Sequence, residues 1–308
     1  MTMPVLNIDI SCERNCTRFI VKASGETPVS RMLQGRTPAE ALKLLPFIFN
    51  LCPTAQGAAA AMAMGCPVTA ATGTNIALET LREHAMVILR DWPAALRNAP
   101  DTDGLSGLAG LSADTLGKLE RALFGRPASV VLNDFDNWTK RSSAGPAMDL
   151  ATVAEWPKDL GRIDGGRDPT FIGRVSHHHA VAALIRREGV TLFTRMAART
   201  IEAALLIEAI RTGDTGPRCG RSASGEGWAE AARGRLTHSV QMENGRVAAY
   251  RVNRPTDGMA GDGAFLEALL QSAFGDGEQP SRKRLAIALT CADPCMPVVW
   301  NSQAVYYA

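Results

Sequence analysis

The chain has 308 residues, of which 46% are hydrophobic and 21% are charged, and its formal net charge is only +2. The balanced charge argues against a nucleic-acid partner, and the hydrophobic content argues against a disordered chain. The alanine- and glycine-rich run 55–73 is interrupted by Pro67 and falls short of a membrane span. The N-terminus shows no basic and apolar leader, and the seven cysteines are odd in number. We therefore expect a soluble, cytoplasmic protein with reduced thiols and no membrane insertion.

Helical signals dominate the first part of the chain. Thr37-Pro38-Ala39-Glu40 is a capping box, which predicts a helix through Ala41–Leu51 that Pro46 bends. A second helix is predicted for Pro53–Met64, because proline is favoured at the first helical position. Cys52 lies between these two helices.

Three further helices are predicted from capping residues and from apolar residues that recur with helical spacing. Their expected starts and ends are Thr74 or Asn75 to Trp92, Ser112 to Gly125, and Ser176 to Ile210. Segments 97–112 and 139–175 are rich in Gly, Pro, Ser and Asp, and we predict that they are the least ordered.

The pattern changes in the last third of the chain. Residues 235–252 read as two strands, and Asn244-Gly245 supplies the tight turn of a hairpin. A helix is predicted for Ala264–Phe274, and a buried strand for Leu285–Leu289. The chain is thus predicted to be one mainly helical α+β domain covering residues 1–308, without internal repeats.

Two cysteines, one near each end of the chain, suggest a shared site. Cys52 precedes Pro53, and Cys295 follows Asp293-Pro294. If each proline opens a helix, each sulfur lies at the positive end of a helix dipole, where a thiolate is favoured. Thiolates are the ligands that soft metals prefer. We therefore expect Cys52 and Cys295 to meet at one metal site.

For the other cysteines and histidines considered as metal ligands, a structural role is the preferred interpretation. Cys291 precedes Cys295 by four residues and could add a ligand, but a core residue at a strand end is the preferred interpretation. Cys12 and Cys16 could share a helix face, although their spacing is not C-x-x-C. The histidines of His177-His-His179 project in different directions from a helix start. Sequence motifs of hydrolases, metalloproteases and nucleotide-binding proteins are missing.

Four blocks of the sequence resemble the large subunit of nickel–iron hydrogenases. Two match cysteine segments of that family, one matches an arginine segment, and one matches a helix. The blocks are Arg31–Gly65 with Leu51-Cys-Pro-Thr-Ala-Gln56, similar to R-x-C-G-x-C-x-x-x-H; Thr74–Leu96, similar to the helix after it; Glu226–His238, similar to E-A-P-R-G-x-L-x-H and continued by Arg254-Pro-Thr256; and Asp293-Pro-Cys295, similar to the start of D-P-C-x-x-C-x-x-H.

The differences from that family concern its metal ligands and the residues around them. Each of the family's two cysteine pairs is reduced here to one cysteine. The replacing residues are Phe49 and Val298 for cysteines, Phe47 for an arginine, Gln56 and Asn301 for histidines, and Ala232 for a proline. The E-G-H segment expected near the enzyme's N-terminus is also missing. Ala232 and Gln56 are expected to loosen or rehydrate the wall of the site.

This cysteine-poor pattern resembles the HupK/HoxV type of hydrogenase maturation protein, a paralogue of the large subunit. The resemblance implies a hydrogenase large-subunit-like helical core with a small β-hairpin or sheet region. It implies a non-catalytic scaffold that binds an Fe(CN)2(CO) unit transiently and binds no nickel. Cys52 and Cys295 would be the iron ligands, and Arg233, Pro255 and Thr256 would line the cyanide and carbonyl groups. The unit would come from a small HypC-like chaperone and HypD and would pass to the hydrogenase large subunit.

Two other functions stay open at this point. One is a metal-free mimic of the large subunit that docks maturation factors. The other is a degenerate enzyme with iron-only redox chemistry, which the missing nickel ligands and the missing E-G-H segment disfavour.

Overall fold

The computed structural model is mainly helical and contains two small sheets, which confirms the predicted α+β class. It describes residues 4–13, 16–25, 28–97, 99–106, 108, 110–163, 168–260, 264–274 and 281–301. The helices are α1 (Val29–Leu33), α2 (Pro38–Ile48), α3 (Pro53–Ala63), α4 (Thr72–Met86), α5 (Trp92–Arg97), α6 (Thr102–Ser106), α7 (Leu116–Phe124), α8 (Ala128–Asn133), α9 (Phe135–Arg141), α10 (Gly145–Ala154), α11 (Ile172–Val175), α12 (His179–Glu188), α13 (Leu192–Thr212), α14 (Phe265–Ser272) and α15 (Arg282–Ala292).

The strands and the remaining helical turns are shorter. The strands are β1 (Val5–Glu13), β2 (Cys16–Ser24), β3 (Cys219–Arg221), β4 (Gly227–Ala231), β5 (Gly234–Glu243), β6 (Arg246–Asn253) and β7 (Val298–Asn301). A π-helical turn, η1 (Val87–Asp91), joins α4 to α5, and two 3-10 turns are η2 (Ala113–Thr115) and η3 (Pro255–Gly258).

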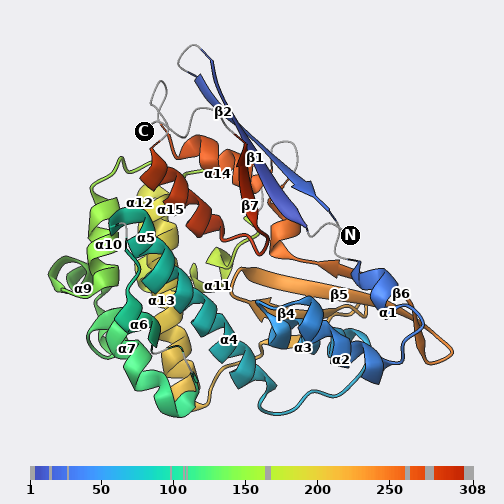
Figure 1. The fold of residues 1–308 in the computed structure, drawn as a ribbon. Coiled ribbons are helices and arrows are strands. Elements are labelled where there is room, and N and C mark those ends of the chain that lie inside the picture. The colour runs from blue at the N-terminus through green and yellow to red at the C-terminus, as the bar shows by residue number, and fades with distance from the viewer. Residues whose placement is uncertain are drawn as a thin grey trace.

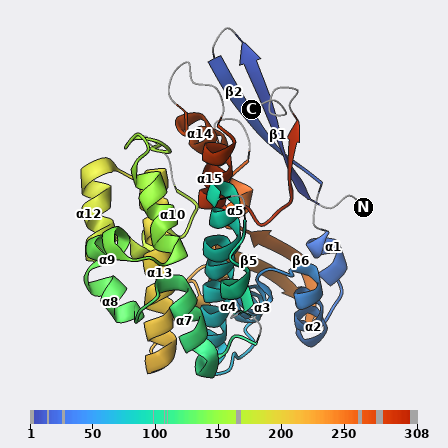
Figure 2. The same ribbon diagram turned by 60° about the vertical axis from the view of Figure 1, so that its left-hand side comes forward.

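The longest helix, α13, runs through the middle of the helical body (Figures 1 and 2). Side chains on every face of α13 are buried, and it packs against α4, α8, α10 and α12. A helix that is buried all round needs neighbours on all sides, which its own sequence pattern does not reveal. The main hydrophobic core surrounds this helix.

The long helix predicted from Ser176 to Ile210 is two helices, and this prediction was wrong. Gly189 ends α12 with a φ of +77°, a conformation that favours glycine. The side chain of Thr191 then caps α13 by accepting a hydrogen bond from the backbone N–H of Thr194. The apolar spacing is helical on both sides of the break, so periodicity alone could not locate it.

The four-stranded antiparallel sheet has the order β3-β4-β5-β6. β5 and β6 form the predicted hairpin, in which Glu243 pairs with Arg246. Asn244 and Gly245 have φ angles of 51° and 72°, as a two-residue hairpin turn requires. Helix α3 packs on β4, and α2 lies beside α3 (Figure 1). This packing positions Cys52, the residue that immediately precedes α3.

A second sheet, with the order β2-β1-β7, joins the two ends of the chain. β7 runs parallel to β1, with Leu6 opposite Val298 and Asp9 opposite Asn301. The N-terminal hairpin β1–β2 lies over α14 (Figure 1), and the rings of Phe19 and Phe274 stack at 5.7 Å. The sequence analysis did not identify this hairpin. Because β1 of the hairpin pairs with β7, the hairpin also fixes the position of the Cys295 segment, which directly precedes β7.

Three further predictions about elements were wrong. The run Leu285–Leu289 lies inside α15 and is not a strand, because its polar neighbours extend the helix on both sides. Segment 139–175 contains α10 and α11, so these parts of it are more ordered than predicted, and its residues 164–167 lie outside the described residues. Cys12 and Cys16 belong to β1 and β2 and cannot share a helix face; their side chains lie outside the described residues.

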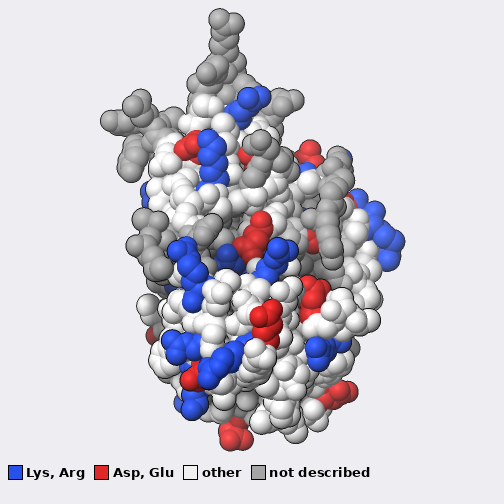
Figure 3. All heavy atoms as spheres, turned by 90° about the vertical axis from the view of Figure 1, so that its right-hand side faces the viewer, with Lys and Arg blue, Asp and Glu red and all other residues white. Residues whose placement is uncertain are grey.

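Two surface properties bear on the expected partners. None of the described helices combines the length and the apolar character that crossing a membrane requires. On the face shown in Figure 3, Lys and Arg side chains are interspersed with Asp and Glu. Among the described residues, the basic side chains of this face form no broad patch for a polyanion.

Candidate metal centre

Three segments that are far apart in sequence meet beside the start of α3. Cys52 occupies the N-cap position of that helix and is followed by Pro53. The turn η3 begins with the buried Pro255 and presents the fully buried Thr256. The third segment follows α15, where Asp293 adopts a left-handed conformation (φ 51°) that turns the chain toward Cys295. The site therefore depends on tertiary packing and not on any local motif.

Cys295 is held by Thr256 through two hydrogen bonds. The hydroxyl Oγ1 of Thr256 donates to Sγ of Cys295 at 3.1 Å, and the backbone N–H of Cys295 donates to the same Oγ1, also at 3.1 Å. A hydroxyl has one donor and two acceptor positions, so one side chain can serve both bonds. The donor of Thr256 is thus directed at a sulfur, whereas the sequence analysis assigned it to a cyanide group.

The thiols of Cys52 and Cys295 lie within electrostatic range of each other and of Arg233. A charge on Cys295 raises the pKa of Cys52, and charges on both sulfurs raise the pKa of Arg233. The structure therefore brings together the three residues that the sequence analysis placed at one site. Their role in holding a metal stays a prediction.

The predicted thiolate character of Cys52 is not supported. Burial raises the pKa of Cys52 to about 12, although Gln56 and Arg233 act in the opposite direction. The carboxylate of Glu79 accepts the N–H groups of Thr54 and Ala55 at 2.7 and 3.0 Å, so the positive end of α3 already faces an anion. Without a metal the Cys52 proton is retained, and a metal ion would have to displace it.

Cys295 also departs from the predicted local structure. Pro294 does not open a helix; it follows the last turn of α15, and the chain continues into β7. The sulfur of Cys295 therefore does not lie at a helix N-terminus. Its hydrogen-bond donor is a side chain, Thr256, and not a helix end.

Arg233 is anchored by two carboxylates and one carbonyl group. Its Nε donates to the backbone oxygen of Asp293 at 2.8 Å, its Nη2 to Oδ1 of Asp293 at 3.1 Å, and its Nη1 to Oε2 of Glu83 at 3.4 Å. Burial disfavours its charge, but Asp293 and Glu83 outweigh burial and raise the pKa of Arg233. Glu230, which lies three residues before Arg233, binds Arg174 and Arg235 instead. Three of the five N–H groups of Arg233 are used in this way.

A buried ionic network continues from this arginine into the helical body. Oδ2 of Asp293 pairs with Arg199, and Nη1 of Arg199 contacts Nδ1 of His84 at 2.9 Å. Nε2 of His84 lies 2.8 Å from Glu202, which also binds Arg174. Burial lowers the pKa of His84 to about 4, so His84 is neutral near pH 7. The sequence analysis did not identify this network, because its members are single charged residues on separate elements.

Gln56 is fixed at both ends of its amide group. Its Nε2 donates to Sγ of Cys52 at 3.5 Å, and its Oε1 lies 2.7 Å from Nε2 of His238. Nδ1 of His238 lies 2.6 Å from the hydroxyl of Tyr250. Gln56 is 1% exposed. The expectation that Gln56 loosens or rehydrates the wall of the site therefore finds no support in the packing.

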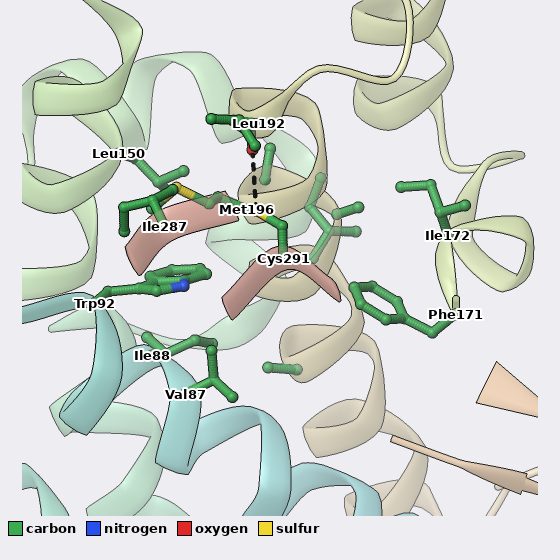
Figure 4. Close-up of a cluster of buried hydrophobic side chains, with 14 of the residues drawn as sticks. Val87, Ile88, Trp92, Leu150, Phe171, Ile172, Leu192, Met196, Ile287 and Cys291 are labelled. Atoms are coloured by element: carbon green, nitrogen blue, oxygen red, sulfur yellow. Dashed lines mark hydrogen bonds between the residues drawn. The ribbon is translucent and has the colours of Figure 1, made fainter. Parts of the chain in front are cut away.

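Cys291 and the histidine run do not join the site. Cys291 lies in α15 and not at a strand end, and its side chain points into an apolar cluster that includes Trp92, Met196 and Ile287 (Figure 4). The histidines of 177–179 lie at the start of α12, as expected for a helix end. Among the described residues, no group of three or more His, Cys, Asp or Glu side chains is arranged to hold a metal ion.

An open groove with a volume of about 1000 Å³ leads to Cys295 from the surface. Its lining includes Arg233, Glu83, Asp293 and Leu51. A partner chain or a small anionic complex could therefore approach the sulfur from outside without unfolding any element.

The replaced family positions have different surroundings here. Phe49 is buried beside His238, with ring centroids 6.4 Å apart, whereas Phe47 is 82% exposed. Val298 lines the groove, and Asn301 donates to the carboxylate of Asp9 at 3.0 Å. None of these four residues offers a thiol or an imidazole to the site.

Curated relatives match this chain over most of its length. HupK of Rhizobium leguminosarum bv. viciae, a hydrogenase expression/formation protein, is 27% identical over 359 residues, covering 94% of each chain. HoxV of Cupriavidus necator, with the same description, is 26% identical over 357 residues, covering 89% of this chain and 91% of its own. This chain is a homologue of the HupK and HoxV proteins. HupK of Rhodobacter capsulatus is 42% identical over a shorter stretch of 73 residues, 24% of each chain.

Solved structures show the fold of this HupK/HoxV homologue. An NAD+-reducing [NiFe]-hydrogenase in the H2-reduced state matches with a TM-score of 0.59 and 13% identity, over 93% of this chain and 94% of that one. The oxidised Ni-Fe-Se hydrogenase of D. vulgaris Hildenborough matches with a TM-score of 0.57 and 12% identity, over 96% and 98%. The predicted hydrogenase large-subunit-like fold is thus confirmed. No model of a known protein family matches the chain.

Proposed function

We propose that this chain acts in the maturation of a nickel–iron hydrogenase as a non-catalytic scaffold. In this proposal, Cys52 and Cys295 bind an Fe(CN)2(CO) unit transiently and release it to the hydrogenase large subunit. The observation that carries the proposal is the meeting of Cys52, Cys295 and Arg233, of which Cys295 and Arg233 line an open groove. The names of the relatives support the maturation role, and the fold supports a paralogue of the large subunit.

The chemistry of the donors suits this cargo. Iron that already carries two cyanides and one carbonyl needs few further ligands, and sulfur is a suitable donor for it. Binding displaces the Cys52 proton to solvent, because the pKa of the free thiol is raised to about 12. The permanent charge of Arg233 offsets the negative charge that the thiolates and cyanides bring. Its two remaining N–H groups are donors of the kind that cyanide nitrogens accept.

The small number of metal ligands supports a protein that carries the iron unit. It argues against catalysis by a nickel–iron centre. The two cysteines supply half of the thiolates that the four-cysteine enzyme site uses, and the described residues hold no cluster of three ligands. Two thiols hold a metal complex less firmly than four, which favours release. A HypC-like chaperone and HypD are the proposed source of the cargo, and the groove beside Cys295 is the proposed approach.

Infrared spectroscopy tests this proposal directly. The chain is purified without oxygen from cells that express the hydrogenase maturation proteins, and its spectrum and iron content are recorded. We expect cyanide and carbonyl bands that disappear in Cys52→Ala and Cys295→Ala. Cys66→Ser is the matched control, since Cys66 is another partly exposed free cysteine. Absence of the bands from the unmodified chain would contradict the proposal, and co-purification with the large subunit would then favour the metal-free mimic.

A further inference from the structure

A continuous chain of hydrogen bonds leads from Tyr250 to the sulfur of Cys52. The hydroxyl of Tyr250 lies 2.6 Å from Nδ1 of His238, and Nε2 of His238 lies 2.7 Å from Oε1 of Gln56. Nε2 of Gln56 lies 3.5 Å from Sγ of Cys52. Gln56 and His238 are fully buried, and Tyr250 is 6% exposed. Members of this chain come from α3, β5 and β6, which tertiary packing brings together.

Each bond in this chain fixes the direction of the next one. Oε1 of Gln56 can only accept a hydrogen bond, so Nε2 of His238 must carry the proton that joins them. A neutral imidazole has one N–H, so Nδ1 must accept, and the hydroxyl of Tyr250 must donate to it. Burial keeps His238 neutral by lowering its pKa to about 3. The amide N–H of Gln56 is then left to point at the sulfur.

The same residues could also form the chain in the opposite direction. If the amide of Gln56 rotated by half a turn, its N–H would donate to Nε2 of His238 and its oxygen would face the sulfur of Cys52. His238 would then carry its proton on Nδ1 and donate to Tyr250. An amide oxygen against a thiolate is repulsive, so this second arrangement opposes metal binding, whereas the first favours it.

The geometry points to Tyr250, His238 and Gln56 as positioning residues that hold an amide N–H donor against the sulfur of Cys52. This inference rests on the proposed function, because a donor at this sulfur matters when the sulfur binds iron. A hydrogen bond to a ligand sulfur draws electron density from it and tunes the metal. Phe49, which stands where the enzyme family has a cysteine, is buried beside the ring of His238.

The tautomer of His238 tests this direction in the metal-free protein. NMR of ¹⁵N-histidine-labelled protein reports which ring nitrogen carries the proton, and we expect Nε2–H for His238. His84 is an internal control, because Glu202 accepts from its Nε2 and Arg199 donates to its Nδ1. In Tyr250→Phe we expect His238 to become a mixture of tautomers while His84 stays unchanged. A wild-type His238 with its proton on Nδ1 would overturn the inference.

The carbonyl band of the loaded protein provides a second readout. Without the amide donor the sulfur gives more electron density to iron, so we expect the band to move to lower wavenumber in Gln56→Met and in Tyr250→Phe. Cys66→Ser should leave the band unmoved. An unshifted carbonyl band in both Gln56→Met and Tyr250→Phe would overturn the inference. If the unmodified protein shows no bands, the proposed function fails. The tautomer of His238 alone then decides whether the hydrogen bonds direct an amide N–H at the sulfur of Cys52.

Discussion

The hydroxyl of Thr256 makes two hydrogen bonds to one residue of the candidate site, Cys295. It is completely buried, it donates to the sulfur of Cys295, and it accepts from the backbone N–H of the same residue. The accepting role has a clear energetic consequence. A buried N–H without an acceptor costs roughly 1–3 kcal/mol, more than the net gain of a formed hydrogen bond.

We predict that Thr256→Val destabilises the protein by about 1–3 kcal/mol, although valine has nearly the same shape. The Cys295 N–H would lose its acceptor, and the sulfur would lose its donor. Thr256→Ser keeps the hydroxyl and should recover most of the stability. Urea unfolding of the three proteins measures the difference. Equal unfolding midpoints for the valine variant and the wild type would contradict this account of Thr256.

Single residues at the site differ in how far the sequence could predict them. Cys52 and Cys295 are 243 positions apart, and they were paired by the proline next to each of them and by the resemblance to a known family. The contact of Gln56 with His238, 182 positions later, has no local signal at all. A buried glutamine close to a cysteine is compatible with many structures. The packing of α3 on the sheet decides which residues Cys52 and Gln56 contact, and a sequence pattern does not encode this packing.

At the scale of elements, the packing of α3 on β4 determines where Cys52 lies. Gly227 at the start of β4 allows the backbone of the helix to come very close. A Cβ atom on Gly227 would lie 1.9 Å from the carbonyl oxygen of Ala59 and 2.4 Å from the backbone nitrogen of Ala63. Both neighbours are backbone atoms of α3, so no side chain can move aside to relieve the clash.

We therefore predict that Gly227→Ala is strongly destabilising, by about 3 kcal/mol or more, at the upper end of the range for overpacked cores. Gly57→Ala in α3 is the matched control, since nothing lies within 4 Å of its added Cβ. Alanine at that helical position should stabilise the protein by roughly 0.5–1 kcal/mol. Thermal unfolding distinguishes the two variants. A wild-type melting temperature for Gly227→Ala would show that α3 does not approach β4 as described.

The success of element predictions depended on how local their signals were. The capping box at Thr37 and the Asn244-Gly245 turn are complete within four residues, and both are present in the structure. The run Leu285–Leu289 is five apolar or small residues long, which fits a strand and a buried helix equally well. Its true state, α15, follows from packing against α5, α13 and α14. Elements of this kind need tertiary information.

At the scale of the whole molecule, two buried neutral histidines couple the fold to pH. His84 and His238 are both 0% exposed, and burial lowers their pKa values to about 4 and about 3. In an unfolded chain each would titrate near 6.5. Between these values the unfolded state binds more protons than the folded state. The stability that the two neutral histidines contribute is therefore fully present above pH 6.5, and it is lost as the pH falls toward 4.

Below pH 6.5, each of these histidines should make the free energy of unfolding fall by about 1.4 kcal/mol for each pH unit that the pH decreases. Glu79 and Asp149, whose pKa values burial raises, act in the opposite direction, so the comparison of variants is more informative than the total slope. We predict that His84→Gln removes about 1.4 kcal/mol per pH unit from the slope between pH 6.5 and 4.5. His177→Gln, which replaces an exposed histidine, is the control.

Urea unfolding at several pH values between 4.5 and 7 measures both slopes. The lower limit of pH 4.5 excludes Glu202, whose pKa is lowered from 4.5 to about 2; burial opposes this shift, but Arg174 and His84 outweigh it. Glu202 therefore adds its own loss of stability only below this range. If His84→Gln kept the wild-type slope, His84 would have to be protonated in the folded state. The ionic network from Arg233 to Glu202 would then carry one more positive charge than its contacts suggest, and the account of its support for the candidate site would have to change.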